Sequence, residues 1–152
     1  MSGSKPELPR LEDFAVVTTE KTRFGDTDAF GHFNNAVVST FLESGRSELL
    51  RHGVVDAATA GCQFVLVRIE IDYRDELHFP GEVIIGSAVA RIGRTSLAFD
   101  QAVFQHGICR VVSRSTLAQV DPKLKASVEL TSEARAHFAA LGPVAVREFT
   151  DR

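Results

Sequence analysis

The feature that most constrains the fold is a single helical pattern followed by four β-type segments. Between residues 35 and 52 the apolar positions recur on one helical face, and they are Val38, Phe41, Leu42, Gly45 and Leu49. Segments 64–74, 83–92, 96–105 and 109–120 are rich in β-branched and aromatic residues, and short turns punctuate them. One long amphipathic helix must bury its apolar face on one side of the resulting sheet. We therefore predict an α+β layer architecture.

The remaining elements follow from the same patterns. Segment 14–24 predicts a first strand, 53–61 a loop, and 131–142 a short helix with an N-cap residue and a closing glycine. Because tight turns join the last four strands, we expect them to form an antiparallel meander.

Two details of these segments predict local packing. In segment 64–74, alternate residues from Val65 to Tyr73 are apolar, which predicts one buried and one wetter face. Gly45 lies inside the helix on its apolar face, where glycine costs roughly 1 kcal/mol relative to alanine. We expect another backbone to come close at Gly45.

Chain length and composition limit the classes of protein to which this chain can belong. The 152 residues suit one domain, which we place at 11–152 after a polar, flexible tail at 1–10. A net charge of −3 offers no electrostatic support for nucleic-acid binding. No apolar run approaches the ~20 residues of a membrane span and no signal core opens the chain, so we expect a cytoplasmic protein. Cys62 and Cys109 belong to no metal or disulfide motif and are expected to be buried free thiols.

The segment "GDTDAFGHFNN" concentrates polar and turn-forming residues directly before the helix. An EF-hand is excluded because Phe30 and Val37 occupy the fifth and twelfth positions, where that loop needs oxygen ligands. A metal or phosphoaspartate site on Asp26, Asp28 and His32 is a second interpretation, although no further His/Asp cluster accompanies it.

A third interpretation is a catalytic carboxylate beside a helix N-terminus. The first turn of a helix has unpaired N–H groups and a partial positive charge, which can polarise a carbonyl oxygen. If the helix begins near residues 34–36, Asp28 stands ready to attack that carbonyl or to activate a water. Ordinary helix capping by Asp, Gly and Asn is the simpler alternative.

The stretch "RFGDTDAFGHFNNAVV…FLESGRSELL" resembles the opening signature of the hotdog-fold acyl-CoA thioesterases, the 4-hydroxybenzoyl-CoA thioesterase-like family. Three later segments lie where that family has its meander of strands, namely "HFPGEV", "RIGRTSLAF" and "GICRVVSRSTLAQVD". The resemblance implies an antiparallel sheet wrapped around one central helix and hydrolysis of a thioester. It also implies a homodimer or homotetramer with sites formed between subunits.

The resemblance further assigns roles within the motif. Asp28 is the implied nucleophile or general base, and the backbone N–H groups of Asn35 and Ala36 are the implied oxyanion donors. Gly31 shapes the turn, and Asp26 orients the loop. The remaining candidates are His32 and Asn34, which bond the loop backbone or touch the acyl group, and Glu43, a helix carboxylate. Val38 stands where many relatives carry an aromatic residue, so the acyl pocket need not copy theirs.

Coenzyme A is anionic at its phosphates, so we expect arginine side chains to meet it. The candidates are Arg91, Arg94, Arg110 and Arg114, together with Ser96 beside the turn at 92–95. Arg94 is preferred because the relatives that the chain resembles carry a basic residue and a serine in this turn. Coenzyme A enters as part of the substrate, and no metal or redox cofactor is implied.

Two other functions remain open on the same fold. A hydratase or dehydratase would need an acid–base pair, for which His32 is the available histidine. A binding module for acyl-CoA or acyl-carrier protein would need no catalysis, since fold alone does not determine function.

Overall fold

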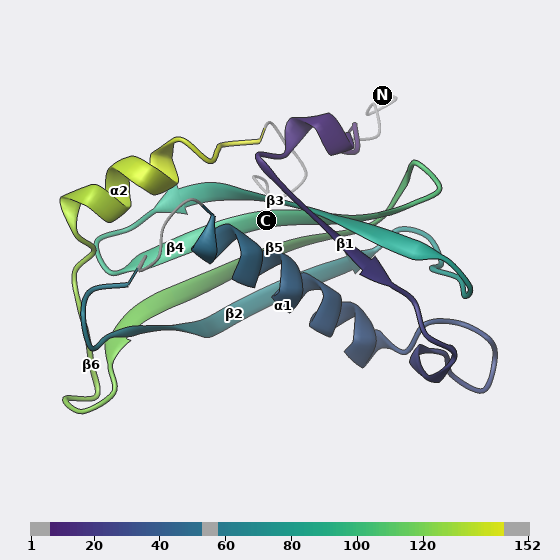
Figure 1. Cartoon of the computed structure of the whole chain (residues 1–152), viewed down its shortest axis with the longest axis horizontal. Coiled ribbons are helices and arrows are strands. Elements are labelled where there is room, and N and C mark those ends of the chain that lie inside the picture. Colours follow the sequence, from purple (N-terminus) through teal and green to yellow (C-terminus); the bar gives the residue numbers. More distant parts are fainter. Residues whose placement is uncertain (1–6, 53–57, 145–152) are drawn as a thin grey trace, which may run out of the picture.

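The computed structural model describes residues 7–52 and 58–144 and confirms the hotdog architecture. One curled antiparallel sheet wraps around one long helix (Figure 1). In chain order the elements are η1 (Leu11–Asp13), β1 (Val16–Lys21), η2 (Phe24–Asp26), α1 (Asn35–Arg51), β2 (Gln63–Tyr73), β3 (Glu82–Ile92), β4 (Ser96–Gln105), β5 (Ile108–Asp121), β6 (Ala126–Ser127) and α2 (Ser132–Ala139).

The strand order corrects the predicted four-strand meander. The order across the sheet is β1-β3-β4-β5-β2, so β3, β4 and β5 form a meander while β2 pairs with β5. The Pro-Gly turn at 80–81 is the end of a longer connection, 74–81. Adjacent strands lie about 4.8 Å apart, so this connection is long enough to pass β5 and β4 and reach β3.

Strand β2 does not have the uniform buried face that its alternation predicts. A bulge between Leu66 and Arg68 shifts the register with β5. Because side chains alternate between the two faces of a sheet, the extra residue of a bulge reverses which face each later residue of the strand points to. Ile69 and Ile71 therefore pack toward α1, while Val67 is 59% exposed. Because β2 is an edge strand, none of its residues is fully buried in the described chain.

The core lies between α1 and the inner face of the sheet. The N-terminal half of α1 packs through Val38, Phe41 and Leu42 on the centre of the sheet. Its C-terminal half packs through Leu49 into a second cluster, which α2 completes with Phe138. Helix α1 rests mainly on β1, β3 and β4, whereas β2 contributes to this core through the partly buried side chains of Ile69 and Ile71.

Gly45 marks the closest approach of α1 to the sheet, but the neighbours are side chains rather than the predicted backbone. A Cβ at this position would lie 2.6 Å from Ile85 Cγ2, 2.7 Å from Gln101 Nε2 and 2.8 Å from Ser87 Oγ. Gln101 is held there, because its Nε2 donates to the Leu42 carbonyl and to Ser87 Oγ, both at 2.9 Å. Glycine is required because this polar contact occupies the space of a side chain.

The ends of the chain and the cysteines complete the description. Residues 1–6 of the predicted tail lie outside the described residues, whereas Pro9 is buried. Cys109 is buried as predicted, whereas Cys62 is only partly buried. The described part of the chain contains no helix with the length and apolarity needed to cross a membrane.

Candidate active site

The loop before α1 is folded by its own polar side chains. Asp26 is buried, and its Oδ2 accepts the backbone N–H of Arg23 at 2.8 Å. Its carbonyl oxygen accepts the N–H of Asn34 at 2.9 Å, which ties the beginning of the loop to its end. The carboxylate of Asp26 therefore faces Arg23, where it orients the loop, rather than joining Asp28 and His32 as the metal interpretation requires.

Asp28 is exposed and is held in place from one side only. Its Oδ1 accepts the backbone N–H groups of Phe30 at 2.8 Å and His32 at 3.0 Å. Its Oδ2 accepts no hydrogen bond from the residues that the structure describes. Gly31 closes the loop with φ of +79°, a backbone conformation that favours glycine. The loop thus fixes one oxygen of Asp28 and leaves the other available.

The first turn of α1 offers one backbone donor beside this carboxylate. Asn34 is the N-cap, and its Oδ1 accepts the N–H of Ala36 at 2.9 Å. The N–H of Val37 is also taken, by the Asn34 carbonyl at 2.9 Å. The N–H of Asn35 has no acceptor among the described residues. Of the two expected oxyanion donors, Asn35 is available and Ala36 is occupied.

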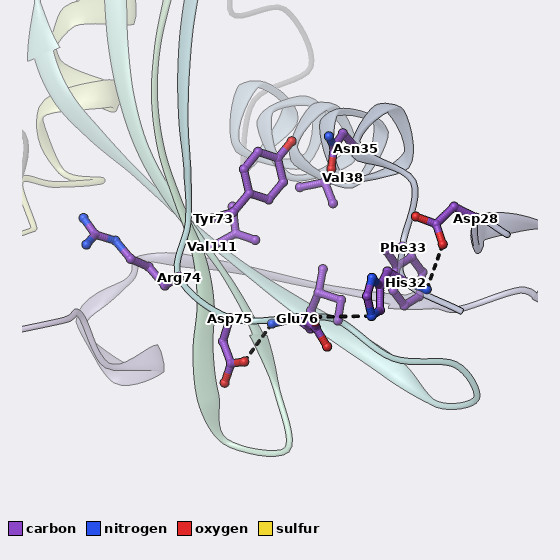
Figure 2. A pocket seen from close by; sticks show the side chains of 11 residues that line it. Asp28, His32, Phe33, Asn35, Val38, Tyr73, Arg74, Asp75, Glu76 and Val111 are labelled. Carbon is purple, nitrogen blue, oxygen red and sulfur yellow. Dashed lines mark hydrogen bonds and ion pairs between the residues drawn. The ribbon is translucent and has the colours of Figure 1, made fainter. Parts of the chain in front are cut away.

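A pocket of about 330 Å³ brings these groups together (Figure 2). Asp28, His32 and Asn35 line it from the loop and from the start of α1, and the end of β2 and the following residues form the opposite side. The full lining comprises Asp28, His32, Phe33, Asn35, Val38, Tyr73, Arg74, Asp75, Glu76, Leu77 and Val111.

The polar lining residues that the sequence did not predict come from one segment, 73–76. His32 Nε2 lies 3.3 Å from Glu76 Oε1, and Asp75 Oδ2 accepts a hydrogen bond from Arg110 Nη1 at 2.6 Å. The available signal was the polar run "YRDE" directly after a strand. That run becomes part of the site only because β2 pairs with β5, which places Tyr73 opposite Val111.

The ionisation of Tyr73 can be followed by absorbance spectroscopy. It is the sole tyrosine of a chain without tryptophan, so ultraviolet absorbance near 295 nm on alkaline titration reports this phenol alone. Burial raises the pKa of Tyr73 above its ordinary value of 10.0. We therefore expect a titration midpoint above that of the urea-unfolded chain. A midpoint at or below the unfolded value would contradict the placement of Tyr73.

The same shift predicts the direction of a stability change. Between the unfolded and the folded pKa of Tyr73, the folded chain keeps a proton that the unfolded chain has lost. The contribution of this group to stability is therefore complete below the unfolded pKa and is lost as pH rises through the folded pKa. Chemical unfolding at several alkaline pH values measures it, with Tyr73→Phe as the control that removes it.

The other site candidates do not join the pocket within one chain. Glu43 is exposed and lines a separate groove with Thr18 and Glu20 of β1, so its catalytic role stays a prediction. Ser96 pairs with Ala118 on β5, whereas the pocket lies at Val111; roughly 24 Å of extended strand separates them. Arg91 and Arg94 belong to the same distant end of the sheet, because Arg91 lines a groove with Phe138 of α2 and the Arg94 carbonyl accepts a hydrogen bond from Arg135 Nη2 at 3.0 Å.

The two remaining arginines are already paired. Arg114 Nε and Nη2 donate to the two carboxylate oxygens of Asp100 at 2.7 and 2.8 Å. That hydrogen bonding raises the pKa of Arg114. Because the neighbouring residue Gln101 faces α1, Asp100 and its partner face the opposite side of the sheet. Arg110 is buried and bonded to Asp75 at the edge of the pocket. Contact of either arginine with a phosphate stays a prediction.

Metal-ligating side chains do not cluster in the described chain. Within residues 7–52 and 58–144, no group of three or more His, Cys, Asp and Glu side chains is arranged to hold a metal ion.

Comparison with known proteins supplies the family. A thioesterase from Thermus thermophilus, solved with coenzyme A and Zn, is 28% identical with a TM-score of 0.77, covering 88% of this chain and 99% of its own. The PA5185 protein of Pseudomonas aeruginosa is 26% identical with a TM-score of 0.78, and the match covers 91% of this chain and 99% of that protein. A predicted thioesterase from Bacillus stearothermophilus shares the fold, with 23% identity and a TM-score of 0.74. The match covers 84% of this chain and 96% of that protein. Among curated proteins nothing matches. The model of the thioesterase-like superfamily matches residues 22–139, and this chain therefore belongs to that hotdog-fold superfamily.

Proposed function

We propose that this protein hydrolyses acyl-CoA thioesters in the pocket of Asp28. The observation that carries the proposal is that Asp28 and Asn35 line one cavity. One carboxylate oxygen of Asp28 and the N–H of Asn35 have no hydrogen-bond partner among the described residues. The carboxylate of Asp28 can act as a nucleophile or a base, and the N–H of Asn35 can donate a hydrogen bond to a developing oxyanion. The coenzyme A ligand of the Thermus thermophilus relative supports the class of substrate.

The reaction can proceed by two routes from this geometry. In both, the thioester carbonyl oxygen lies against the N–H of Asn35. Asp28 either attacks the carbonyl carbon, forming an anhydride that water then cleaves, or takes a proton from a water that attacks instead. Each route consumes one water, breaks the C–S bond and releases a carboxylic acid and the free thiol of coenzyme A.

Thiol release tests the proposal. Short, long and aromatic acyl-CoAs are incubated with catalytic amounts of the protein, and free thiol is followed with a colorimetric reagent. We expect release from at least one acyl class, well above the rate without protein. Absence of release from every acyl-CoA, with a folded protein that binds coenzyme A, would favour the binding module.

One contact favours a hydratase as the second candidate. The 3.3 Å pair of His32 and Glu76 is the His/Glu arrangement that such an enzyme uses for proton transfer. The two functions differ in their product, because hydration of an enoyl-CoA retains the thioester and releases no thiol. Mass analysis of the product separates them.

We also propose that the protein works as a homodimer or a tetramer of such dimers. Strand β2 is an edge of the sheet with exposed apolar side chains, Leu66 at 47% and Val67 at 59%. Edges of this kind favour pairing with another strand, and a second copy supplies one. A dimer would also offer each pocket the arginines of its partner, which one chain keeps too distant. Sedimentation equilibrium should give a multiple of 16.6 kDa, and a monomer at micromolar concentration would contradict the proposal.

A further inference from the structure

We propose that the hydroxyl group of Tyr73 is a second hydrogen-bond donor to the thioester carbonyl oxygen, beside the N–H of Asn35. The inference rests on the proposed function, because it concerns the carbonyl that Asp28 would attack. It assigns a catalytic group to β2, an element that lies outside the motif before α1.

The start of α1 supplies too few donors by itself. The N–H groups of Ala36 and Val37 are taken by Asn34. Of the first three N–H groups of α1, that of Asn35 alone has no acceptor among the described residues, and Asn35 lines the pocket. Oxyanion sites stabilise a tetrahedral intermediate with several donors aimed at one point, and side chains such as tyrosine can complete them. The pocket therefore needs a donor from another element.

Strand geometry directs Tyr73 toward that point. Ile69, Ile71 and Tyr73 follow the bulge at alternate positions, so they share the face on which Ile69 and Ile71 pack toward α1. Tyr73 pairs with Val111 of β5, and both line the pocket with Asn35. Figure 2 shows the phenol reaching from the end of β2 toward the first turn of α1, at Asn35 and Val38.

The chemistry of the phenol suits a donor. Its hydroxyl bonds to none of the described residues, and the side chain is 49% exposed, so a ligand can reach it. A tyrosine with the ordinary pKa of 10.0 already keeps its O–H protonated at neutral pH, and burial raises the pKa of Tyr73 further. Three other donors around the pocket are already paired. His32 Nε2 faces Glu76, and Arg110 is bonded to Asp75. Arg74 Nη2 lies 3.4 Å from Asp72 Oδ2.

The role requires no proton transfer. As Asp28 or water attacks the carbonyl carbon, the carbonyl oxygen gains negative charge and both hydrogen bonds shorten. When the C–S bond breaks and the carbonyl re-forms, Tyr73 keeps its proton and the hydrogen bonds relax. The donors therefore act more strongly on the transition state than on the bound substrate, which raises kcat.

The activity test removes the hydroxyl and keeps the ring. Tyr73→Phe should lower kcat by roughly a hundredfold, as loss of one oxyanion donor does, with KM changed by no more than about threefold. Thr19→Val deletes a hydroxyl on the exposed face of β1, outside both the pocket and the groove of Glu43, and should retain the wild-type kcat. A Tyr73→Phe enzyme with wild-type kcat would overturn the inference.

A binding test separates this inference from the proposed function. The ligands are two analogues of acetyl-CoA in which carbon replaces sulfur, one a ketone and the other the matching alkane. Titration calorimetry gives the ratio of their affinities for wild type and Tyr73→Phe. We expect wild type to prefer the ketone and the variant to lose about tenfold of that preference, the worth of one hydrogen bond.

The outcomes of the binding test are distinct. Equal weakening of both analogues in Tyr73→Phe would overturn the inference, because the ring would then contribute shape alone. A wild type without preference for the ketone would also overturn it. A hydroxyl-dependent preference without any thiol release would uphold the carbonyl contact and refute the hydrolase proposal.

Discussion

Asp28→Asn should lower kcat for thiol release by roughly a hundredfold to ten-thousandfold. The amide neither attacks a carbonyl carbon nor accepts a proton from water, and loss of such a group costs that range. The fold should be retained, because the amide oxygen of asparagine can still accept the N–H groups of Phe30 and His32. The measurement is steady-state thiol release on the best acyl-CoA, together with thermal unfolding of both proteins.

Asp121→Asn is a matched control for this change. Asp121 Oδ1 also accepts two backbone N–H groups, from Lys123 at 2.8 Å and Leu124 at 3.1 Å, but it lies at the end of β5 and outside the pocket. The same chemical change there should leave kcat within about twofold, since surface substitutions usually act weakly. Turnover undiminished in a folded Asp28→Asn protein would refute the assignment of Asp28.

Gly45→Leu should destabilise the protein by about 3 kcal/mol or more. A Cβ alone would lie less than 3 Å from Ile85, Ser87 and Gln101, and Gln101 cannot move without losing its bond to α1. Overpacking a filled core costs roughly 1–3 kcal/mol for small additions, and leucine adds four carbon atoms. Because leucine favours helices over glycine, the loss cannot come from helix propensity. Urea unfolding followed by circular dichroism measures it.

Thr40→Leu provides the comparison on the same helix. Thr40 is exposed, so leucine there meets no core atom. We expect a stability change within about 0.5 kcal/mol, as for most surface positions. Similar losses in the two variants would show that Gly45 does not owe its place to the close contact with β3 and β4.

Local structure was predictable where neighbouring residues decide it. The start of α1 at Asn35, the bounds of β4 and the hairpin at His106 and Gly107 follow from capping, alternation and turn chemistry. Asp28 and Asn35 meet in one pocket because seven positions and a tight turn separate them. The occupied donor at Ala36 was equally local, since an N-cap asparagine ordinarily takes the N–H two residues on.

Other features depended on contacts between distant segments. The pairing of β2 with β5 rather than β3 depends on which edge a strand reaches through its connection, and alternation alone does not specify a partner. The bulge at Val67 and the side chains beneath Gly45 depend on register across the sheet. These contacts join residues far apart in sequence, so no local pattern encodes them.

The order of residues along the chain was enough to specify the α+β layer, the long central helix, the family signature and the position of Asp28 before a helix start. What faces that carboxylate was settled by the folded chain: Tyr73 and Glu76 come from the far end of β2 and the residues after it, while Glu43 and Arg94 lie elsewhere. The physical reason is the distance along the sequence between the residues that interact. Hydrogen bonds of loops and caps form within a few residues, whereas the opposite wall of a pocket is set by strand order and register.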